Sequence, residues 1–259
     1  MTGALAGHRI VVTRAEEPGG PLAAALRRAG ATAIVVPLIR IEPVAQVDRA
    51  TWTTVADFDW LVFTSANGLR SFVERLDATE RAAFRAHRRI ASVGPATARA
   101  VAEAGGNSAL IAPEFIAESL ANALGDVSGR RILWPRAAGA RDVLAQTLRS
   151  RGAVLVDRVI YKTVPLEVPD AFRNDVLTAH VVTFTSPSAV RAFVSAFGTD
   201  VRPRIVCIGP VTAFAAREAG LTVHALAGVF TLDGLVDAAL EVVEAIAAAP
   251  VEEHASPIA

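Results

Sequence analysis

Short runs of β-branched and other apolar residues alternate along the chain with stretches that have helical spacing. Leu22 and Leu26 show the helical spacing early in the chain, and Ala98, Val101 and Ala102 show it farther on. Strand–helix–strand units of this kind form parallel sheets with helices on both faces. Right-handed crossovers bring the strand-to-helix loops to one sheet edge, where ligands bind in such folds. The pattern therefore predicts an α/β fold with its candidate site in these loops.

The two halves of the chain carry the same series of segments, offset by roughly 120 residues. The matching pairs are Arg9–Arg14 with Arg131–Arg136, Val62–Ser65 with Thr183–Ser186, Leu69–Phe72 with Val190–Phe193, and Ile90–Pro95 with Ile205–Pro210. Because the order and the offset persist through the chain, the sequence predicts an internal duplication. We expect two similar lobes, each a parallel β-sheet flanked by helices.

Two extended stretches at equivalent places in the copies interrupt the alternation, Leu38–Pro43 and Ile160–Pro165. Each ends at a proline, which disfavours helix in the residue before it. We interpret them as a two-stranded connector between the lobes. The expected boundaries are 1–37 and 166–259 for the first, discontinuous lobe, 42–159 for the second, 38–41 and 160–165 for the connectors, and 250–259 for a disordered tail.

Composition narrows the functional classes. The 26 basic residues balance 26 acidic ones, which gives no electrostatic reason to expect a nucleic-acid or membrane partner. Cys207 is the only cysteine, so no disulfide framework or thiolate metal cluster is expected. No apolar run approaches the ~18 residues that a membrane span needs. We therefore expect a cytoplasmic location. A monomer is a separate expectation.

Four loops at predicted strand ends share one chemical character, a small capping residue followed by a helix. They are Thr64–Gly68, Gly94–Thr97, Thr185–Ser188 and Gly209–Thr212. Backbone N–H groups at a helix start favour anions through hydrogen bonds and the helix dipole. Ser65, Thr97, Ser186 and Thr212 are thus candidate contacts for a ligand with several negative charges. The alternative interpretation, ordinary helix caps, stays open.

Three further residues are candidates. Arg14 and Arg136 occupy equivalent places after the opening strands, and arginine suits bidentate binding of a carboxylate. A solvated or structurally paired arginine is the alternative. Tyr161, the only tyrosine, lies in a predicted connector strand. A phenol titrates near pH ~10, so at neutral pH it can only donate a proton. A purely structural tyrosine is again the alternative.

Several kinds of site are missing. The five histidines are scattered without metal-ligand spacing. The sequence has no glycine-rich dinucleotide fingerprint, no phosphate-loop lysine and no nucleophile elbow. An enzyme with this sequence is expected to work without cofactor or metal, by holding a reactive substrate in shape.

Several motifs together resemble the uroporphyrinogen-III synthase family over about residues 8 to 245. They are Val12–Arg14, Phe63–Gly68, Val93–Ala98, Tyr161–Pro165, Phe184–Ser188 and Ile208–Ala213. No single motif is specific, whereas their order and the duplication are. One departure is Phe115–Ser119, where the family often has a threonine after the aromatic residue.

The resemblance implies a bilobed fold with a two-stranded connector and an active site between the lobes. It implies a cofactor-free lyase that cyclises hydroxymethylbilane, a linear tetrapyrrole with eight carboxylates, and inverts ring D to give uroporphyrinogen III in haem biosynthesis. The family's proton donor carries over to Tyr161, and its substrate-binding hydroxyls carry over to Thr97, Ser186 and Thr212. Ser65 is added by its equivalence to Ser186, and Arg14 lies in a family motif.

Two other functions fit the same pattern. One is a non-catalytic two-lobed receptor for an anionic metabolite, and the other is a regulatory protein that keeps the binding but not the turnover. The ratio of porphyrin isomers formed from hydroxymethylbilane distinguishes both from an enzyme.

Overall fold

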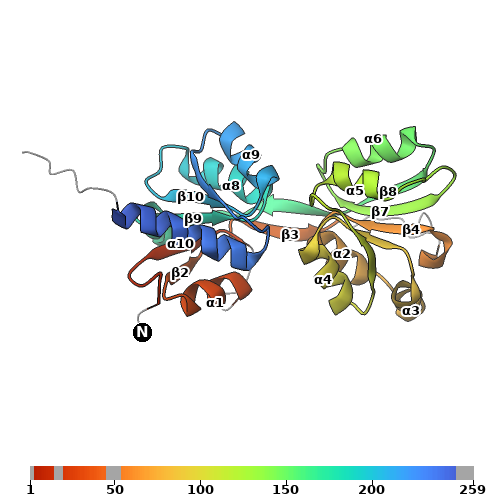
Figure 1. Cartoon of the computed structure of the whole chain (residues 1–259), viewed down its shortest axis with the longest axis horizontal. Helices are drawn as coiled ribbons and strands as arrows, with labels where there is room; N and C mark the ends of the chain where they lie inside the picture. Colours follow the sequence, from red (N-terminus) through yellow and green to blue (C-terminus); the bar gives the residue numbers. More distant parts are fainter. Residues whose placement is uncertain (1–2, 15–19, 45–53, 249–259) are drawn as a thin grey trace, which may run out of the picture. The chain divides into compact units, whose positions relative to one another are not determined.

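A computed structural model of the chain describes residues 3–14, 20–44 and 54–248 (Figure 1). The chain divides into two compact units. Unit 1 consists of Met1–Arg40 and Pro165–Ala259, and unit 2 consists of Ile41–Val164. The disordered tail expected at 250–259 lies outside the described residues.

Unit 1 is built on a five-stranded sheet with the strand order β11-β10-β9-β1-β2. All four neighbouring pairs are parallel. The strands are β1 (Arg9–Val12), β2 (Thr32–Val35), β9 (Val181–Phe184), β10 (Arg204–Cys207) and β11 (Val223–Leu226). The helices are α1 (Pro21–Arg28), α7 (Asp170–Leu177), α8 (Pro187–Phe197), α9 (Pro210–Glu218) and α10 (Leu232–Ala248).

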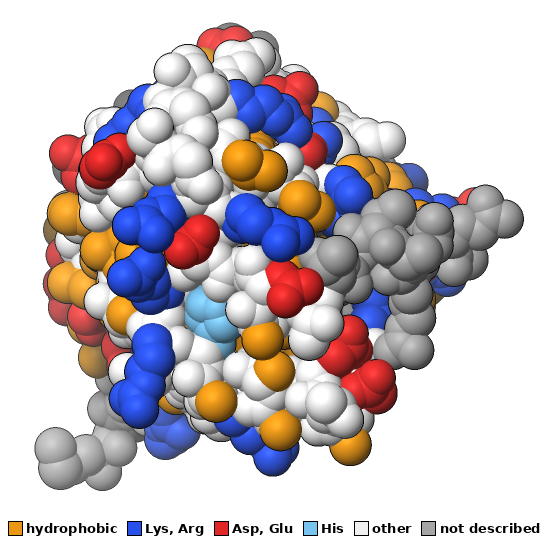
Figure 2. All heavy atoms as spheres, turned by 90° about the vertical axis from the view of Figure 1, so that its right-hand side faces the viewer, with side chains coloured by type: hydrophobic (Ala, Val, Ile, Leu, Met, Phe, Trp, Pro, Cys, Tyr) orange, Lys and Arg blue, Asp and Glu red, His pale blue; other side chains and the backbone are white. Residues whose placement is uncertain are grey.

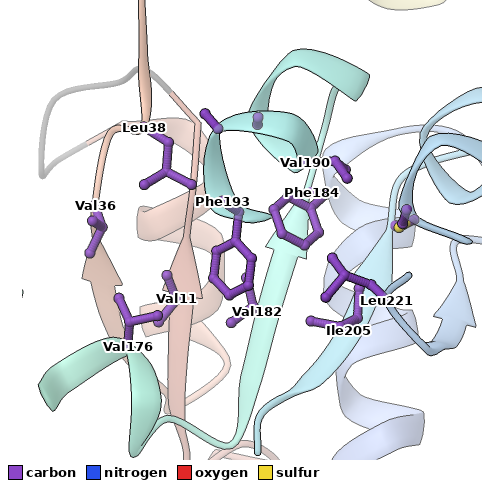
Figure 3. Packing of buried hydrophobic residues seen from close by; sticks show 14 of the residues in the cluster. Val11, Val36, Leu38, Val176, Val182, Phe184, Val190, Phe193, Ile205 and Leu221 are labelled. Carbon is purple, nitrogen blue, oxygen red and sulfur yellow. The ribbon is translucent and has the colours of Figure 1, made fainter. Parts of the chain in front are cut away.

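Hydrophobic residues alternate between the two faces of this sheet, because successive side chains of a strand point in opposite directions. Ile10 packs with residues of α1 and α10, whereas Val11 packs on the face covered by α8 and α9. On the second face, the rings of Phe184 and Phe193 meet edge to face with their centroids 5.2 Å apart (Figure 3). Burying such a side chain contributes about 1.5–3 kcal/mol. The short strands thus carry helices on both faces, as the sequence predicts.

Unit 2 contains a six-stranded sheet with the order β3-β8-β7-β4-β5-β6. The strands are β3 (Ile39–Pro43), β4 (Trp60–Phe63), β5 (Ile90–Ser92), β6 (Ser108–Ile111), β7 (Arg131–Ala137) and β8 (Val154–Pro165). The helices are η2 (Val55–Asp57, a 3-10 turn), α2 (Ala66–Val73), α3 (Ala78–Ala86), α4 (Pro95–Glu103), α5 (Ala117–Ala123) and α6 (Val143–Ser150).

Both faces of the second sheet are also covered. On one face Phe63 meets Phe72 of α2 and Phe84 of α3, with ring centroids 5.5 and 6.3 Å away. On the other face Trp134 packs with residues of α5 and α6. The two units are therefore similar three-layer α/β structures, and the predicted fold class is confirmed.

Strands β3 and β8 connect the units. The N–H of Val44 donates to the carbonyl of Ile160 at 3.0 Å, and the N–H of Leu166 donates to that of Leu38 at 2.9 Å. The partners run in opposite directions, so this pair is antiparallel, unlike the other described pairs of the sheet. The extended stretch expected from Ile160 is the second part of a single strand that begins at Val154. No breaker residue separates its two parts, so pairing with β7 continues into the connector.

The strand order reveals how the duplication is used. Unit 1 takes β1 and β2 from the first copy and β9, β10 and β11 from the second. Unit 2 takes β4, β5 and β6 from the first copy and β7 and β8 from the second, in the corresponding order. The chain therefore crosses between units inside each copy rather than between copies.

On the face of the molecule in Figure 2, basic and acidic side chains are interspersed with scattered hydrophobic ones. In unit 2, Asp59 forms ion pairs of 3.8 and 3.2 Å with Arg89 and Arg130. No large area of one charge is visible on this face.

Candidate active site

Tyr161 lies in β8 and is buried, with 6% of its surface exposed. Its hydroxyl is 2.8 Å from Oγ of Ser65, a separation at which either group can donate the hydrogen bond. Ser65 is the N-cap of α2, and its Oγ accepts the N–H of Gly68 at 2.9 Å. Ser65 is therefore a helix cap, as one interpretation of the sequence holds, and it also contacts the only tyrosine.

The surroundings of Tyr161 determine its protonation. Burial raises the pKa of the phenol above its ordinary 10.0, and the hydrogen bond with Ser65 opposes this by lowering it. Burial favours the uncharged form, because a phenolate loses its hydration in an apolar environment. The phenol is therefore protonated at neutral pH and is able to donate a proton.

Gly68 makes room for this pair. A Cβ atom at this position would lie 3.1 Å from Oγ of Ser65 and 3.5 Å from Cε1 of Tyr161. The corresponding residue of unit 1 is Ala189, and Tyr161 corresponds there to Ile39. The glycine thus occurs in the unit that has the tyrosine, although the two residues come from different copies. Comparing the copies position by position is the sequence signal that reveals Gly68.

The second loop of unit 2 lies at the same sheet edge, because β4 and β5 are parallel neighbours. Helix α4 begins at Pro95, and Thr97 in its first turn is 4% exposed. Its N-cap is Gly94, and no side chain caps the helix. The first-turn N–H groups have no acceptor within the helix and suit an anion. Phe115, in the left-handed region with a φ of 57°, packs beside Gly94.

Unit 1 has the counterparts of both loops. Ser186 is the N-cap of α8 and accepts the N–H of Ala189 at 3.2 Å. Thr212, in the first turn of α9, is 4% exposed, and the N-cap Gly209 offers no side-chain cap. The four loops therefore fall into two kinds, with two helices capped by serine and two that keep uncapped amides.

Arg14 follows β1 directly and is half-buried. Strand β1 is the neighbour of β9, so Arg14 and Ser186 lie at one edge of the unit 1 sheet. Two buried threonines join these strands. The hydroxyl of Thr13 donates to the carbonyl of Thr183 at 2.7 Å, and that of Thr183 donates to the carbonyl of Val11 at 2.8 Å. The sequence reasoning missed this pair, because the contact depends on strand order.

Arg136 is paired with carboxylates of its own unit. Its guanidinium is 3.0 Å from a carboxylate oxygen of Asp157 and 3.6 Å from one of Asp142, and it lies over the ring of Trp134. Two carboxylates already neutralise this arginine. Its side chain is 18% exposed, which agrees with a structurally paired residue rather than a substrate ligand.

Among the described residues, no group of three or more histidine, cysteine, aspartate or glutamate side chains is arranged to hold a metal ion. A search of the same residues finds no helix with the length and apolar character that a membrane span requires.

Comparison with known proteins identifies the family. The uroporphyrinogen-III synthase HemD family model matches residues 20–237. A uroporphyrinogen-III synthase of Synechococcus elongatus is 37% identical over 249 residues, which cover 90% of this chain and 94% of that protein. A chloroplastic uroporphyrinogen-III synthase of Oryza sativa is 29% identical over 250 residues, with 91% and 81% covered.

Solved structures show the same fold. The crystal structure of the enzyme from Helicobacter pylori matches with a TM-score of 0.64 at 18% identity, covering 90% of this chain and 99% of that chain. A mutant enzyme from Thermus thermophilus matches with a TM-score of 0.60 at 18% identity, covering 92% and 100%. The chain belongs to the uroporphyrinogen-III synthase family.

Proposed function

We propose that this protein is a uroporphyrinogen-III synthase that cyclises hydroxymethylbilane with loss of water and inversion of ring D. The observation that carries the proposal beyond family membership is the buried, protonated phenol of Tyr161. It lies at the carboxyl edge of the unit 2 sheet and is held by Ser65. An acid is the group that this chemistry requires first.

Tyr161 would act on the leaving hydroxyl of ring A. A proton from the phenol converts this hydroxyl into water, and cleavage of the C–O bond leaves an azafulvene cation. Ring D attacks through its substituted carbon to form a spiro intermediate, which breaks and recloses with ring D inverted. The final ring carbon loses one proton, which restores the phenol, so the net change is loss of one water molecule. General acids of this kind contribute about 10²–10⁴-fold to a rate.

The loops without side-chain caps would bind the substrate's carboxylates. The first turns of α4 and α9 offer amide N–H groups beside Thr97 and Thr212, and Ser186 and Arg14 lie at the same edge of unit 1 as Thr212. Hydrogen bonds to a charged group contribute about 1.5–3 kcal/mol each. Such contacts hold a flexible chain in a conformation that favours the hindered carbon of ring D over its free position.

The isomer of the product tests this function. Hydroxymethylbilane closes unaided, without inversion, to the type I isomer. We expect the protein to give type III, measured by separating the porphyrins after oxidation of the products. Formation of type I alone, at the spontaneous rate, would contradict the enzymatic function and leave a binding or regulatory role.

We further propose that the enzyme is a monomer in the cytoplasm and acts without a nucleic-acid partner. The single cysteine, Cys207, supports a reducing compartment, because the chain cannot form a disulfide within itself. Light scattering on the purified protein tests the oligomeric state, and a mass of twice the chain would contradict it.

A further inference from the structure

Arg75 lies just beyond the end of α2 and joins that helix to the connector strands. Its Nη2 donates to the carbonyl of Val44 at 2.9 Å and to the carbonyl of Ile160 at 2.8 Å. Val44 follows β3, and Ile160 precedes Tyr161 in β8. One nitrogen of the arginine therefore holds both connector strands at the residue beside the tyrosine.

The backbone around Tyr161 is fixed on both sides. The carbonyl of Ile160 also accepts the N–H of Val44 at 3.0 Å, and the carbonyl of Tyr161 accepts the N–H of Ala138 at 2.8 Å. The bond from a charged guanidinium is stronger than these neutral bonds, because charge-assisted hydrogen bonds are roughly twice as strong. Arg75 is thus the strongest donor to this stretch of backbone among the contacts described.

The same helix holds Tyr161 at two points. Ser65 at the start of α2 contacts the hydroxyl, and Arg75 beyond its end contacts the preceding carbonyl. A hydroxyl held at one end and a backbone held at the other leave the ring little freedom to rotate or shift. Misplacement of a reacting group by about 1 Å costs up to 10²-fold in rate.

Unit 1 shows that the strand pairing does not need the arginine. Ala196 corresponds to Arg75, yet the equivalent strand bond, from the N–H of Leu166 to the carbonyl of Leu38, is present at 2.9 Å. Ala196 lines an open pocket of about 800 Å³ together with Leu166 and Ser195. Unit 1, which lacks the tyrosine, thus also lacks the arginine, and its connector residues still pair.

We propose that Arg75 is a positioning residue for Tyr161, which holds the phenol at the point where it protonates the substrate. The effect of Arg75 on catalysis rests on the proposed function, whereas its effect on the position of the Tyr161 ring rests on the geometry alone. The coincidence of Arg75, Gly68 and Tyr161 in unit 2 supports this inference, because unit 1 has a different residue at each of the three equivalent positions.

Tyr161 is the only tyrosine of the chain, so the near-ultraviolet absorbance of phenolate titrates this one residue. We expect Arg75→Met to move the pKa of Tyr161 down toward 10.0, because a ring that is held less firmly becomes more hydrated. We also expect kcat to fall roughly tenfold or more, with KM for hydroxymethylbilane within about twofold. Arg70→Met is the matched control. Arg70 belongs to the same helix and forms an exposed ion pair of 3.8 Å with Glu103.

The outcomes separate the two proposals. A Tyr161 titration and kcat unchanged from wild type in Arg75→Met would overturn the inference, even if the variant unfolds at a lower temperature. A lower pKa of Tyr161 in Arg75→Met supports placement of the ring by Arg75. If Tyr161→Phe keeps full turnover, the proposed catalytic role of Tyr161 is wrong, and the placement by Arg75 is unaffected. Arg75→Gln, whose amide is too short to reach both carbonyls, replaces the methionine variant if that variant does not fold. We expect the same decreases in the pKa of Tyr161 and in kcat for Arg75→Gln. Wild-type values of both would again overturn the inference.

Discussion

At the scale of single residues, the serine caps of the two units make a natural comparison. Ser65 and Ser186 have the same extended backbone and each accepts an N–H three residues later. Only Ser65 also contacts a phenol. The sequence predicts both caps because capping is a local property, but the contact with Tyr161 joins residues 96 positions apart and depends on the packing of α2 against β8.

Replacing the two serines separates capping from chemistry. Ser65→Ala and Ser186→Ala should each lower the free energy of unfolding by about 1 kcal/mol, because each removes an N-cap. Only Ser65→Ala should also raise the pKa of Tyr161, since the hydrogen bond that lowers it is lost. Denaturant unfolding and the phenolate absorbance measure the two effects. If the pKa of Tyr161 shifts in neither variant, or by the same amount in both, the contact between Ser65 and Tyr161 is contradicted.

At the scale of elements, two histidines accept backbone hydrogen bonds near the starts of strands. Nδ1 of His180 accepts the N–H of Arg9 at the start of β1, and Nδ1 of His224 accepts the N–H of Ile205 in β10, each at 3.0 Å. Burial, the first cause, lowers the pKa of both histidines below 6.5, and nearby Arg9 and Arg204 act in the same direction. A protonated ring nitrogen cannot accept these hydrogen bonds.

The stability of unit 1 should therefore depend on pH. Since the pKa of each histidine is lower in the folded state, the unfolded chain binds more protons around and below pH 6.5. This contribution to stability is present above that pH and is lost as the pH falls below it toward the folded-state pKa. The double variant His180→Asn with His224→Asn keeps an acceptor near each Nδ1 position. Denaturant titrations on both sides of pH 6.5 should show a smaller loss in the variant than in wild type. Equal losses of stability in the wild type and the double variant would contradict the role of the two histidines.

At the scale of the whole molecule, the duplication accounts for most of what the sequence could predict. Strands, helix starts and the α/β class follow from local patterns repeated twice, and the family follows from the order of the motifs. The distinguishing contacts do not follow in this way. Arg75, Gly68 and Tyr161 meet only after β8 pairs with β7 and α2 packs on the sheet. In the sequence they are only positions where the copies differ. The structure shows that these differences concern residues that lie close together.

The account depends most directly on Tyr161 as the proton donor. Tyr161→Phe keeps the ring in its buried place and removes only the hydroxyl, at a cost in stability of about 1 kcal/mol for the lost hydrogen bond. We expect formation of the type III isomer to slow at least roughly tenfold, while the type I isomer still forms at its spontaneous rate. The measurement is the rate of formation of each isomer from hydroxymethylbilane by the wild-type and variant enzymes. An unchanged rate of type III formation in a folded Tyr161→Phe variant would contradict the account.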